Sequence, residues 1–284
     1  MLDRQDPTTE NKTFSLVSRC VLFCTQLKIG GGFGFGNVQV YFPMLLDLHE
    51  KLSADTPLDI FFLEYSRTPA ATHPVQLREA VCAYQHLLQT LQIDPSKIIL
   101  GGDSAGAMLV LQLLQHIQTP HPSIPIKLPP NSRPSSCIFV SPWLELDQAA
   151  PAYTSNALYD LVPTRCVKRW ATQWAGARRD EWTAPLKFQR NWRDIVPPCL
   201  VMSGEQEILI DDIKHFCSQL KEVHPFIPAS ANSRVDAVWL KSIDGESRMI
   251  GGGEIILCTA YLITLTRCKV IKCWDLSSLE IYEM

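Results

Sequence analysis

Apolar runs of strand length alternate with amphipathic helical segments over most of this chain. In the clearest helical segment, residues 76–91, apolar side chains recur at intervals of three and four positions and line one helix face. The apolar runs are short and nearly continuous, which is typical of strands buried on both faces of a sheet. This alternation predicts an α/β fold with a mostly parallel central sheet and helices on both faces. We expect strands at residues 15–25, 58–65, 97–101, 137–141, 199–203 and 235–243, and helices at residues 38–52, 76–91, 105–118, 156–174 and 210–223.

The 284 residues are 46% hydrophobic and carry a net charge of -3, which suits a globular protein with a sizeable core. We expect one domain over residues 1–284. The basic residues do not cluster, so we expect no nucleic-acid surface. Ten cysteines lie at irregular spacings without a Cys-x-x-Cys pair, so we expect no metal site.

The two ends of the chain show no targeting or membrane signal. Residues 1–13 are polar and of mixed charge, unlike a signal peptide. The longest uncharged run near the end, residues 255–266, is shorter than the roughly 20 residues that span a bilayer. We interpret this run as a buried strand and expect a cytoplasmic protein without a membrane span.

A candidate nucleophile lies between an expected strand and an expected helix. Residues 102–106 read Gly-Asp-Ser-Ala-Gly and match the pattern G-x-S-x-G, with Ser104 at its centre. A sharp strand-to-helix turn requires small residues on both sides of the serine, because backbone segments crowd it. The turn also places the hydroxyl at a helix N-terminus, where negative charge is favoured. The alternative is an incidental serine in a glycine-rich turn.

A glycine-rich loop, residues 30–36, follows the first expected strand and precedes a helix. Glycines let the backbone approach a substrate and aim N–H groups at one point. Together with the N–H of Ala105, such a loop can bind the oxyanion of a tetrahedral intermediate. The alternative is a phosphate-binding loop, but glycines at every second position do not match the nucleotide pattern G-x-G-x-x-G.

These paired motifs resemble the hormone-sensitive-lipase family of α/β-hydrolases, and most closely its small fungal esterase-like members. In that family a His-Gly-Gly-Gly-Phe loop is followed by Gly-Asp-Ser-Ala-Gly, and the resemblance here runs from about Gly30 to Leu220. It implies an α/β-hydrolase fold with a small lid, and hydrolysis of a small carboxylic ester through an acyl-serine, without metal or cofactor. The implied nucleophile is Ser104, and the implied oxyanion donors are Gly31, Gly32 and Ala105.

The resemblance also implies an acid that orients and stabilises an imidazolium. In the family this acid lies in a loop after a late strand, four residues before an acid that opens the next helix. That spacing selects Glu207 as the catalytic acid, with Asp211 at the helix start. Asp211 remains an alternative, although an acidic residue in a first helical turn ordinarily complements the helix dipole.

The pattern breaks where the family has its histidine. The turn after the expected strand 235–243 carries Arg248 and no histidine. Arginine cannot accept a proton, because its guanidinium remains charged. His224 precedes that strand and is the alternative base. The family's loop histidine is replaced by Ile29.

The chain ends also depart from the family, whose likeness extends over about residues 30–250. Residues 1–29 are shorter than the family's N-terminal part, and residues 251–284 have no family resemblance. We expect this tail to pack poorly. Three hypotheses stay open: a serine carboxylesterase that is weakly active or inactive as written, an inactive hydrolase-fold protein that binds a small molecule, and a non-functional product of an altered gene.

Overall fold

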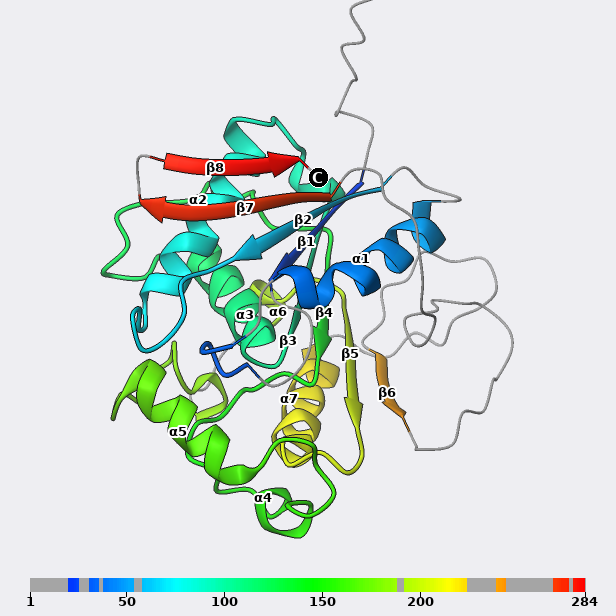
Figure 1. The fold of residues 1–284 in the computed structure, drawn as a ribbon, viewed down its shortest axis with the longest axis vertical. Helices are drawn as coiled ribbons and strands as arrows, with labels where there is room; N and C mark the ends of the chain where they lie inside the picture. The colour runs from blue at the N-terminus through cyan, green and yellow to red at the C-terminus, as the bar shows by residue number, and fades with distance from the viewer. Residues whose placement is uncertain are drawn as a thin grey trace, which may run out of the picture.

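The computed structural model describes residues 20–25, 31–35, 38–53, 58–187, 192–223, 239–243, 268–275 and 278–283. Its eight strands form one sheet in the order β6-β5-β4-β3-β1-β2-β7-β8 (Figure 1). Each neighbouring pair is parallel except β7 and β8, which are antiparallel. The strands are β1 (Cys20–Thr25), β2 (Leu58–Glu64), β3 (Ile98–Asp103), β4 (Ser136–Val140), β5 (Cys199–Gly204), β6 (Trp239–Ile243), β7 (Cys268–Asp275) and β8 (Ser278–Glu283).

The order of connections decides which face of the sheet each helix covers. The chain steps from β1 to β2 in one direction and then crosses back over β1 to β3. Right-handed crossovers therefore place α1 on one face and α2, α3 and α7 on the other. In agreement, α2 packs beside α3, and α6 bridges α3 and α7. The α-helices are α1 (Val38–Ser53), α2 (Val75–Gln89), α3 (Ala105–Gln118), α4 (Ala152–Ser155), α5 (Thr164–Ala175), α6 (Trp192–Ile195) and α7 (Ile210–Val223).

The same reversal creates the place for a site. β1 and β3 are neighbours, yet the helices that follow them lie on opposite faces of the sheet. The two connections diverge at the carboxyl ends of these strands, and open α/β sheets bind ligands at such a switch point. The glycine loop follows β1 and Ser104 follows β3, so both candidate elements lie at this switch point.

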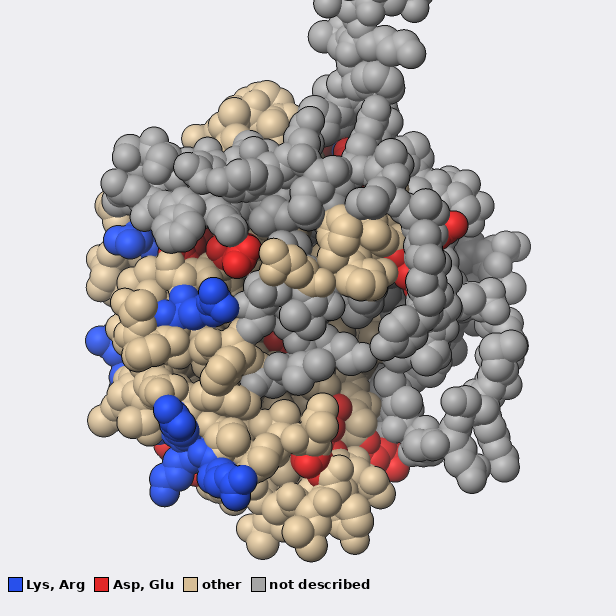
Figure 2. Space-filling model, in the orientation of Figure 1, with Lys and Arg blue, Asp and Glu red and all other residues tan. Residues whose placement is uncertain are grey.

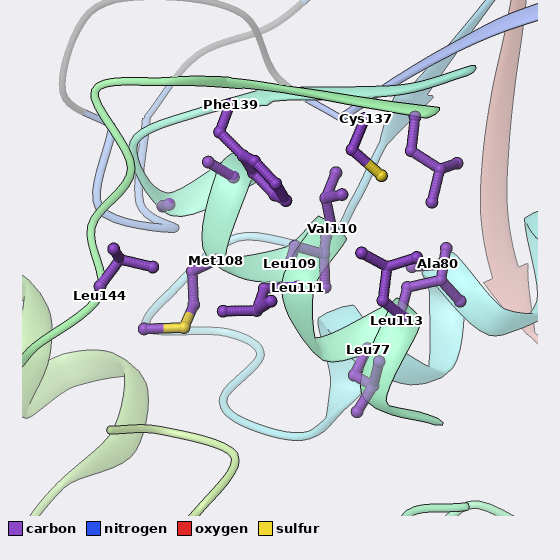
Figure 3. Close-up of a cluster of buried hydrophobic side chains, with 14 of the residues drawn as sticks. Leu77, Ala80, Met108, Leu109, Val110, Leu111, Leu113, Cys137, Phe139 and Leu144 are labelled. Carbon is purple, nitrogen blue, oxygen red and sulfur yellow. The ribbon is translucent and has the colours of Figure 1, made fainter. Parts of the chain in front are cut away.

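The core forms around α3, which is apolar over nearly all of its length. Leu109, Val110 and Leu113 are fully buried, because the helix lies between the sheet and the neighbouring helices. Figure 3 shows side chains of α3 meeting Leu77 and Ala80 of α2 and residues of β4. A helix buried on all sides holds its N-terminus firmly, and that N-terminus carries Ser104.

The predicted mostly parallel sheet with helices on both faces is confirmed. Most element boundaries agree to within a few residues, and those of α3 and α7 agree with the expected ranges. Residues 15–19 and 235–238 of two expected strands lie outside the described residues.

The prediction of one helix over residues 156–174 is wrong in its first half. The structure has a hydrogen-bonded turn there, between α4 and α5. Pro163 precedes α5, and a residue before proline avoids the helical region, so the helix begins only at Thr164. α4 and α5 take the place of the expected small lid, between β4 and β5.

Part of the tail joins the sheet, while the expectation that the tail packs poorly stays a prediction. Residues 268–275 and 278–283 form a hairpin whose first strand pairs with β2, so this part of the tail continues the sheet. An apolar edge strand gains backbone hydrogen bonds by such pairing. Residues 251–267, including the strand expected at 255–266, lie outside the described residues.

Replacing Leu109 by alanine should lower the free energy of unfolding by about 2–5 kcal/mol, because the side chain is fully buried and its removal leaves a cavity. Leu158→Ala is the matched control, since Leu158 is 94% exposed and should change stability by less than about 0.5 kcal/mol. Urea unfolding of the two variants measures both values. Equal stability changes would contradict the placement of α3 in the core.

Candidate active site

Ser104 lies on a sharp turn between β3 and α3. Its backbone has φ 49° and ψ -116°, a conformation that non-glycine residues rarely adopt. The turn is tight because the backbones of Gly102 and Gly106 touch. A Cβ atom at position 102 would stand 2.5 Å from the carbonyl carbon and oxygen of Gly106. The sequence places glycine where a side chain cannot fit, and the serine between them is half-buried rather than enclosed in the helix.

Hydrogen bonds from the end of β4 hold this turn in place. The Ser104 N–H donates to the Val140 carbonyl at 2.9 Å. The Ser104 carbonyl accepts from the Trp143 N–H at 3.1 Å and from the Met108 N–H at 3.2 Å. With its backbone paired in this way, Ser104 can retain a strained conformation that would otherwise relax. The next residue, Ala105, is the first of α3, and such N–H groups have no partner within the helix.

The glycine loop forms a compact turn of its own. The Gly31 carbonyl accepts from the N–H groups of Gly34 at 2.6 Å and Phe35 at 2.9 Å. Gly32 has φ +47°, and the Cδ2 atom of Trp170 lies 2.4 Å from the place that a Cβ on Gly32 would occupy. A side chain at position 32 would therefore meet both backbone strain and the indole ring. Trp170 belongs to α5, so the lid packs directly on this loop.

An aromatic cluster joins the glycine loop to the serine turn. The Phe33 ring stacks on Trp174 with centroids 4.1 Å apart and lies 6.4 Å from the Trp143 ring. Trp143 is the residue whose N–H holds the Ser104 carbonyl. The Phe33 carbonyl accepts from the Thr68 N–H at 2.9 Å, which fixes the loop from a second side. The glycine loop and Ser104 are thus connected through one residue, Trp143, whose ring lies near Phe33 and whose backbone N–H binds Ser104.

Glu207 lies in the short loop between β5 and α7. Its Oε1 accepts hydrogen bonds from the Ser141 hydroxyl at 2.8 Å and from the Gly204 N–H at 2.7 Å. Burial raises the pKa of the Glu207 carboxyl above its ordinary value, although both hydrogen bonds act in the opposite direction. The second oxygen, Oε2, is buried without a hydrogen-bond partner among the described residues. A carboxylate held in this way can accept one further donor.

Ser141 links the carboxylate to the serine turn. It directly follows Val140, whose carbonyl holds the Ser104 N–H, and its own N–H donates to the Met202 carbonyl at 2.7 Å. Ser141 also has a positive φ of 45°, which turns its hydroxyl toward Glu207. The carboxylate and the nucleophile are thus connected through two consecutive residues at the end of β4.

The Asp211 carboxylate is hydrogen-bonded to α4 and not to the segment that holds Ser104. Its Oδ2 accepts from the Ala152 N–H of α4 at 2.8 Å, so the Asp211 carboxylate ties the lid to the start of α7. Between the two acids weighed from the sequence, the geometry favours Glu207, whose carboxylate contacts the segment that holds Ser104.

No histidine in the described part of the chain is hydrogen-bonded to Ser104 or Glu207. His116 and His121 bond to each other and to their own loop. His73 packs against Trp174, and burial lowers its pKa to about 4. The alternative base His224, the expected histidine position Arg248, and Ile29 and Gly30 all lie outside the described residues.

Sequence reasoning named Ser104, Ala105, Gly31, Gly32 and Glu207; the structure connects Ser104 and Glu207 through the end of β4, and the glycine loop to that segment through Phe33 and Trp143. It missed the role of residues 141, 143 and 170 in this arrangement. The stretch Ser-Pro-Trp at 141–143 stood out as family-like, but nothing in the sequence indicated that its hydroxyl bonds Glu207. The contact of Trp170 with Gly32 joins residues far apart in the chain, and one sequence carries no signal for it.

The described residues also bear on other kinds of site. They contain no group of three or more His, Cys, Asp or Glu side chains placed to hold a metal ion. They also contain no helix with the length and apolar character needed to cross a bilayer.

A serine on a strained strand-to-helix turn, beside a glycine loop at the switch point of a parallel sheet, defines the hydrolase class of α/β protein. Comparison with known families agrees: the model of the alpha/beta hydrolase fold family matches residues 29–225. The chain belongs to this family.

The curated relatives are named as esterases and acetyl-hydrolases. The chain is 29% identical over 192 residues to an esterase of Acinetobacter venetianus, covering 66% of this chain and 57% of the relative. It is 26% identical over 188 residues to an acetyl-hydrolase of Streptomyces hygroscopicus, covering 65% and 57%. The chain thus spans little more than half the length of these curated relatives.

Solved structures give the same picture. An esterase from the bacterial hormone-sensitive lipase family superposes with a TM-score of 0.59 at 26% identity, over 80% of this chain and 68% of that one. Carboxyl esterase 2 of the fungus Tuber melanosporum superposes with a TM-score of 0.62, over 80% and 68% of the two chains, and at 18% identity it supports the fold alone. The chain is therefore an α/β-hydrolase similar to the hormone-sensitive lipases.

Gly102→Ala should lower the free energy of unfolding by about 3 kcal/mol, because the new methyl group meets backbone atoms that cannot move aside. Gly176→Ala is the matched control. Gly176 has φ +59° with nothing within 4 Å of a Cβ, so it should lose only about 1 kcal/mol to backbone strain. Urea unfolding measures both. A smaller loss for Gly102→Ala than for Gly176→Ala would refute the close contact at the turn.

Glu207→Gln should stabilise the protein more at pH 8 than at pH 4. Because burial raises the Glu207 pKa above its ordinary value, the folded state binds the proton more tightly than the unfolded chain, so the ionised carboxylate lowers stability as pH rises through the folded pKa. Glutamine does not ionise and removes this dependence. Urea midpoints at both pH values provide the measurement, with exposed Glu205→Gln as control. A difference between parent and variant that does not change with pH would mean that burial does not raise this pKa.

Proposed function

We propose that this chain carries the active site of a serine carboxylesterase that acts on small esters. The observation that carries the proposal is the strained Ser104 turn, joined through Trp143 to the glycine loop and through residues 140–141 to a buried carboxylate. This arrangement supplies a nucleophile, nearby backbone N–H groups and an acid, which are the parts of an acyl-transfer site.

In the proposed reaction the Ser104 oxygen attacks the ester carbonyl carbon, and its proton passes to a base. The N–H groups of Ala105, Gly31 and Gly32 stabilise the oxyanion of the tetrahedral intermediate. Collapse breaks the bond to the alcohol oxygen, which leaves with the proton, and an acyl-serine remains. Water then attacks the acyl-serine, which releases the carboxylic acid and restores the hydroxyl.

The described residues include no histidine bonded to Ser104 or Glu207 that could act as the base in this reaction. The Oε2 of Glu207, which has no partner among the described residues, is where the family's histidine would donate its N–H, since the carboxylate of a serine triad accepts that bond. The sequence has Arg248 at the expected histidine position, and a guanidinium cannot accept the serine proton. We therefore propose that the chain as written turns over esters very slowly.

The substrate class rests on the relatives. Several are named acetyl esterase or acetyl-hydrolase, which favours a small acyl group. No cofactor is required by the proposed mechanism.

A second candidate is binding of a small molecule without turnover. The observation that favours it is that no described histidine is hydrogen-bonded to Ser104 or Glu207, while the glycine loop and the serine turn are intact. The third hypothesis, a non-functional product, predicts that neither turnover nor ligand binding can be restored by one substitution.

The unmodified chain should hydrolyse p-nitrophenyl acetate barely above background, since loss of one triad member lowers turnover on the order of 10⁶-fold. Arg248→His should raise turnover by at least about 100-fold, because general-base catalysis contributes that much or more. Arg248→Gln is the matched control, because it removes the cation without supplying an imidazole. Initial rates of the three proteins make the comparison.

Ser104→Ala combined with Arg248→His should abolish the gain. Fast turnover by the unmodified chain that depends on Ser104 would refute the missing base, and His224→Ala would then identify the base in use. A gain that survives Ser104→Ala would refute the nucleophile. No gain in Arg248→His, with the fold intact, would favour the binding or non-functional alternatives.

A further inference from the structure

The turn between α4 and α5 has its apolar side chains outside and its polar groups inside. Leu158 is 94% exposed, Tyr159 67% and Leu161 80%. Together with Phe35 they are the large apolar side chains that the described residues leave exposed. Three such residues within four positions are not the scattered exposure that ordinary surfaces show, and clusters of this kind mark interaction sites.

Hydrogen bonds hold this apolar turn, residues 158–161, in its outward orientation. The Asn156 side-chain amide donates to the carbonyls of Glu207 at 2.9 Å and Glu205 at 3.3 Å. The Asp160 carboxylate accepts from the N–H groups of Ile208 at 2.6 Å and Val162 at 2.7 Å. The polar side chains of the segment therefore face the protein, and its apolar side chains remain in water.

The helix that follows adds positive charge. α5 buries Val167, Ala171 and Trp174 against the protein and exposes Arg165, Lys168 and Arg169 on its other side. Its twelve residues include no acidic side chain. None of the three cations forms an ion pair within the part of the chain that the structure describes.

Figure 2 shows Lys and Arg side chains where Figure 1 draws α5, beside a surface without Lys or Arg where α4 lies. Acidic side chains lie on the far side of that uncharged surface from α5. A flat anionic partner would therefore contact the apolar turn and α5 together, and would stay away from the acidic side.

We propose that the apolar turn 158–161 and the exposed face of α5 dock on the surface of an anionic lipid bilayer. Leu158, Tyr159 and Leu161 insert among the headgroups, and Arg165, Lys168 and Arg169 bind lipid phosphates. Neither contribution suffices alone, since stable attachment of a peripheral protein takes two signals, here apolar insertion and a basic surface.

Docking in this orientation brings the bilayer close to the candidate active site. The segment that carries the apolar turn is hydrogen-bonded to the backbone of Glu207 and of Ile208. The contact of α5 with the glycine loop through Trp170 connects the same surface to the other half of the site. An ester dissolved in the membrane would reach the site without crossing bulk water.

The test is co-sedimentation of the full chain with phosphatidylcholine vesicles, with and without phosphatidylglycerol, and it requires no catalytic activity. We expect binding to the anionic vesicles that weakens as salt is raised. Replacing Arg165, Lys168 and Arg169 by glutamine should weaken it on the order of 100-fold, at roughly five-fold per cation. Replacing Leu158 and Leu161 by serine should weaken it at least about ten-fold.

The matched control replaces Lys127, Arg193 and Lys214 by glutamine, which removes the same charge from exposed positions outside α5 and should leave binding unchanged. All replaced side chains are exposed, so the thermal midpoints of the variants should match that of the parent, which separates lost binding from lost folding. Absence of binding, equal binding to neutral vesicles, or equal loss in the control would overturn the proposal. So would a stable dimer, measured by light scattering, that the two leucine substitutions dissociate, because a second copy would then cover the turn.

Discussion

The backbones of β3 and α3 come into contact at the turn between them, and only glycine fits at position 102. The chain must reverse there within one residue, and Ser104 takes the strained conformation that the reversal demands. Such strain costs about 1–3 kcal/mol and persists only where the surroundings fix the backbone. Burial of α3 on all sides and the hydrogen bonds of Ser104 to Val140 and Trp143 supply that support.

The four residues at the end of β4 connect the parts of the site. The Val140 carbonyl holds the Ser104 N–H, and the Ser141 hydroxyl holds Glu207. The Trp143 N–H holds the Ser104 carbonyl, while its ring meets Phe33 of the glycine loop. A nucleophile, a carboxylate and an oxyanion loop that are distant in sequence thus share one short support, which limits their relative movement.

Local patterns in the sequence predicted the elements whose cause is local. The continuous apolar run of α3 and the amphipathic run of α7 predicted the correct boundaries, because the apolar side chains that a helix buries recur at a regular spacing in the sequence. The break at residues 156–163 was missed, since polar residues in a turn and on an exposed helix face look alike. It becomes visible only when Asn156 and Asp160 are seen bonding the loop after β5. The hairpin of β7 and β8 was missed because pairing with β2 depends on an edge formed by distant residues.

The residues of the site likewise fall into those that local patterns predicted and those that they did not. Ser104 and the glycine loop were predicted because tight turns restrict residue type, and Glu207 because its spacing from Asp211 resembles a family pattern. The support from Ser141 and Trp170 depends on contacts between distant segments, which no spacing in one chain encodes. The most direct measurement is a crystal structure of the chain after prolonged reaction with a small p-nitrophenyl phosphonate ester. We expect a bond from phosphorus to the Ser104 oxygen, with the phosphoryl oxygen about 2.7–3.1 Å from the amide nitrogens of Ala105 and of Gly31 or Gly32. An adduct on another residue, or a phosphoryl oxygen turned away from both the helix and the glycine loop, would contradict the assignment of this site.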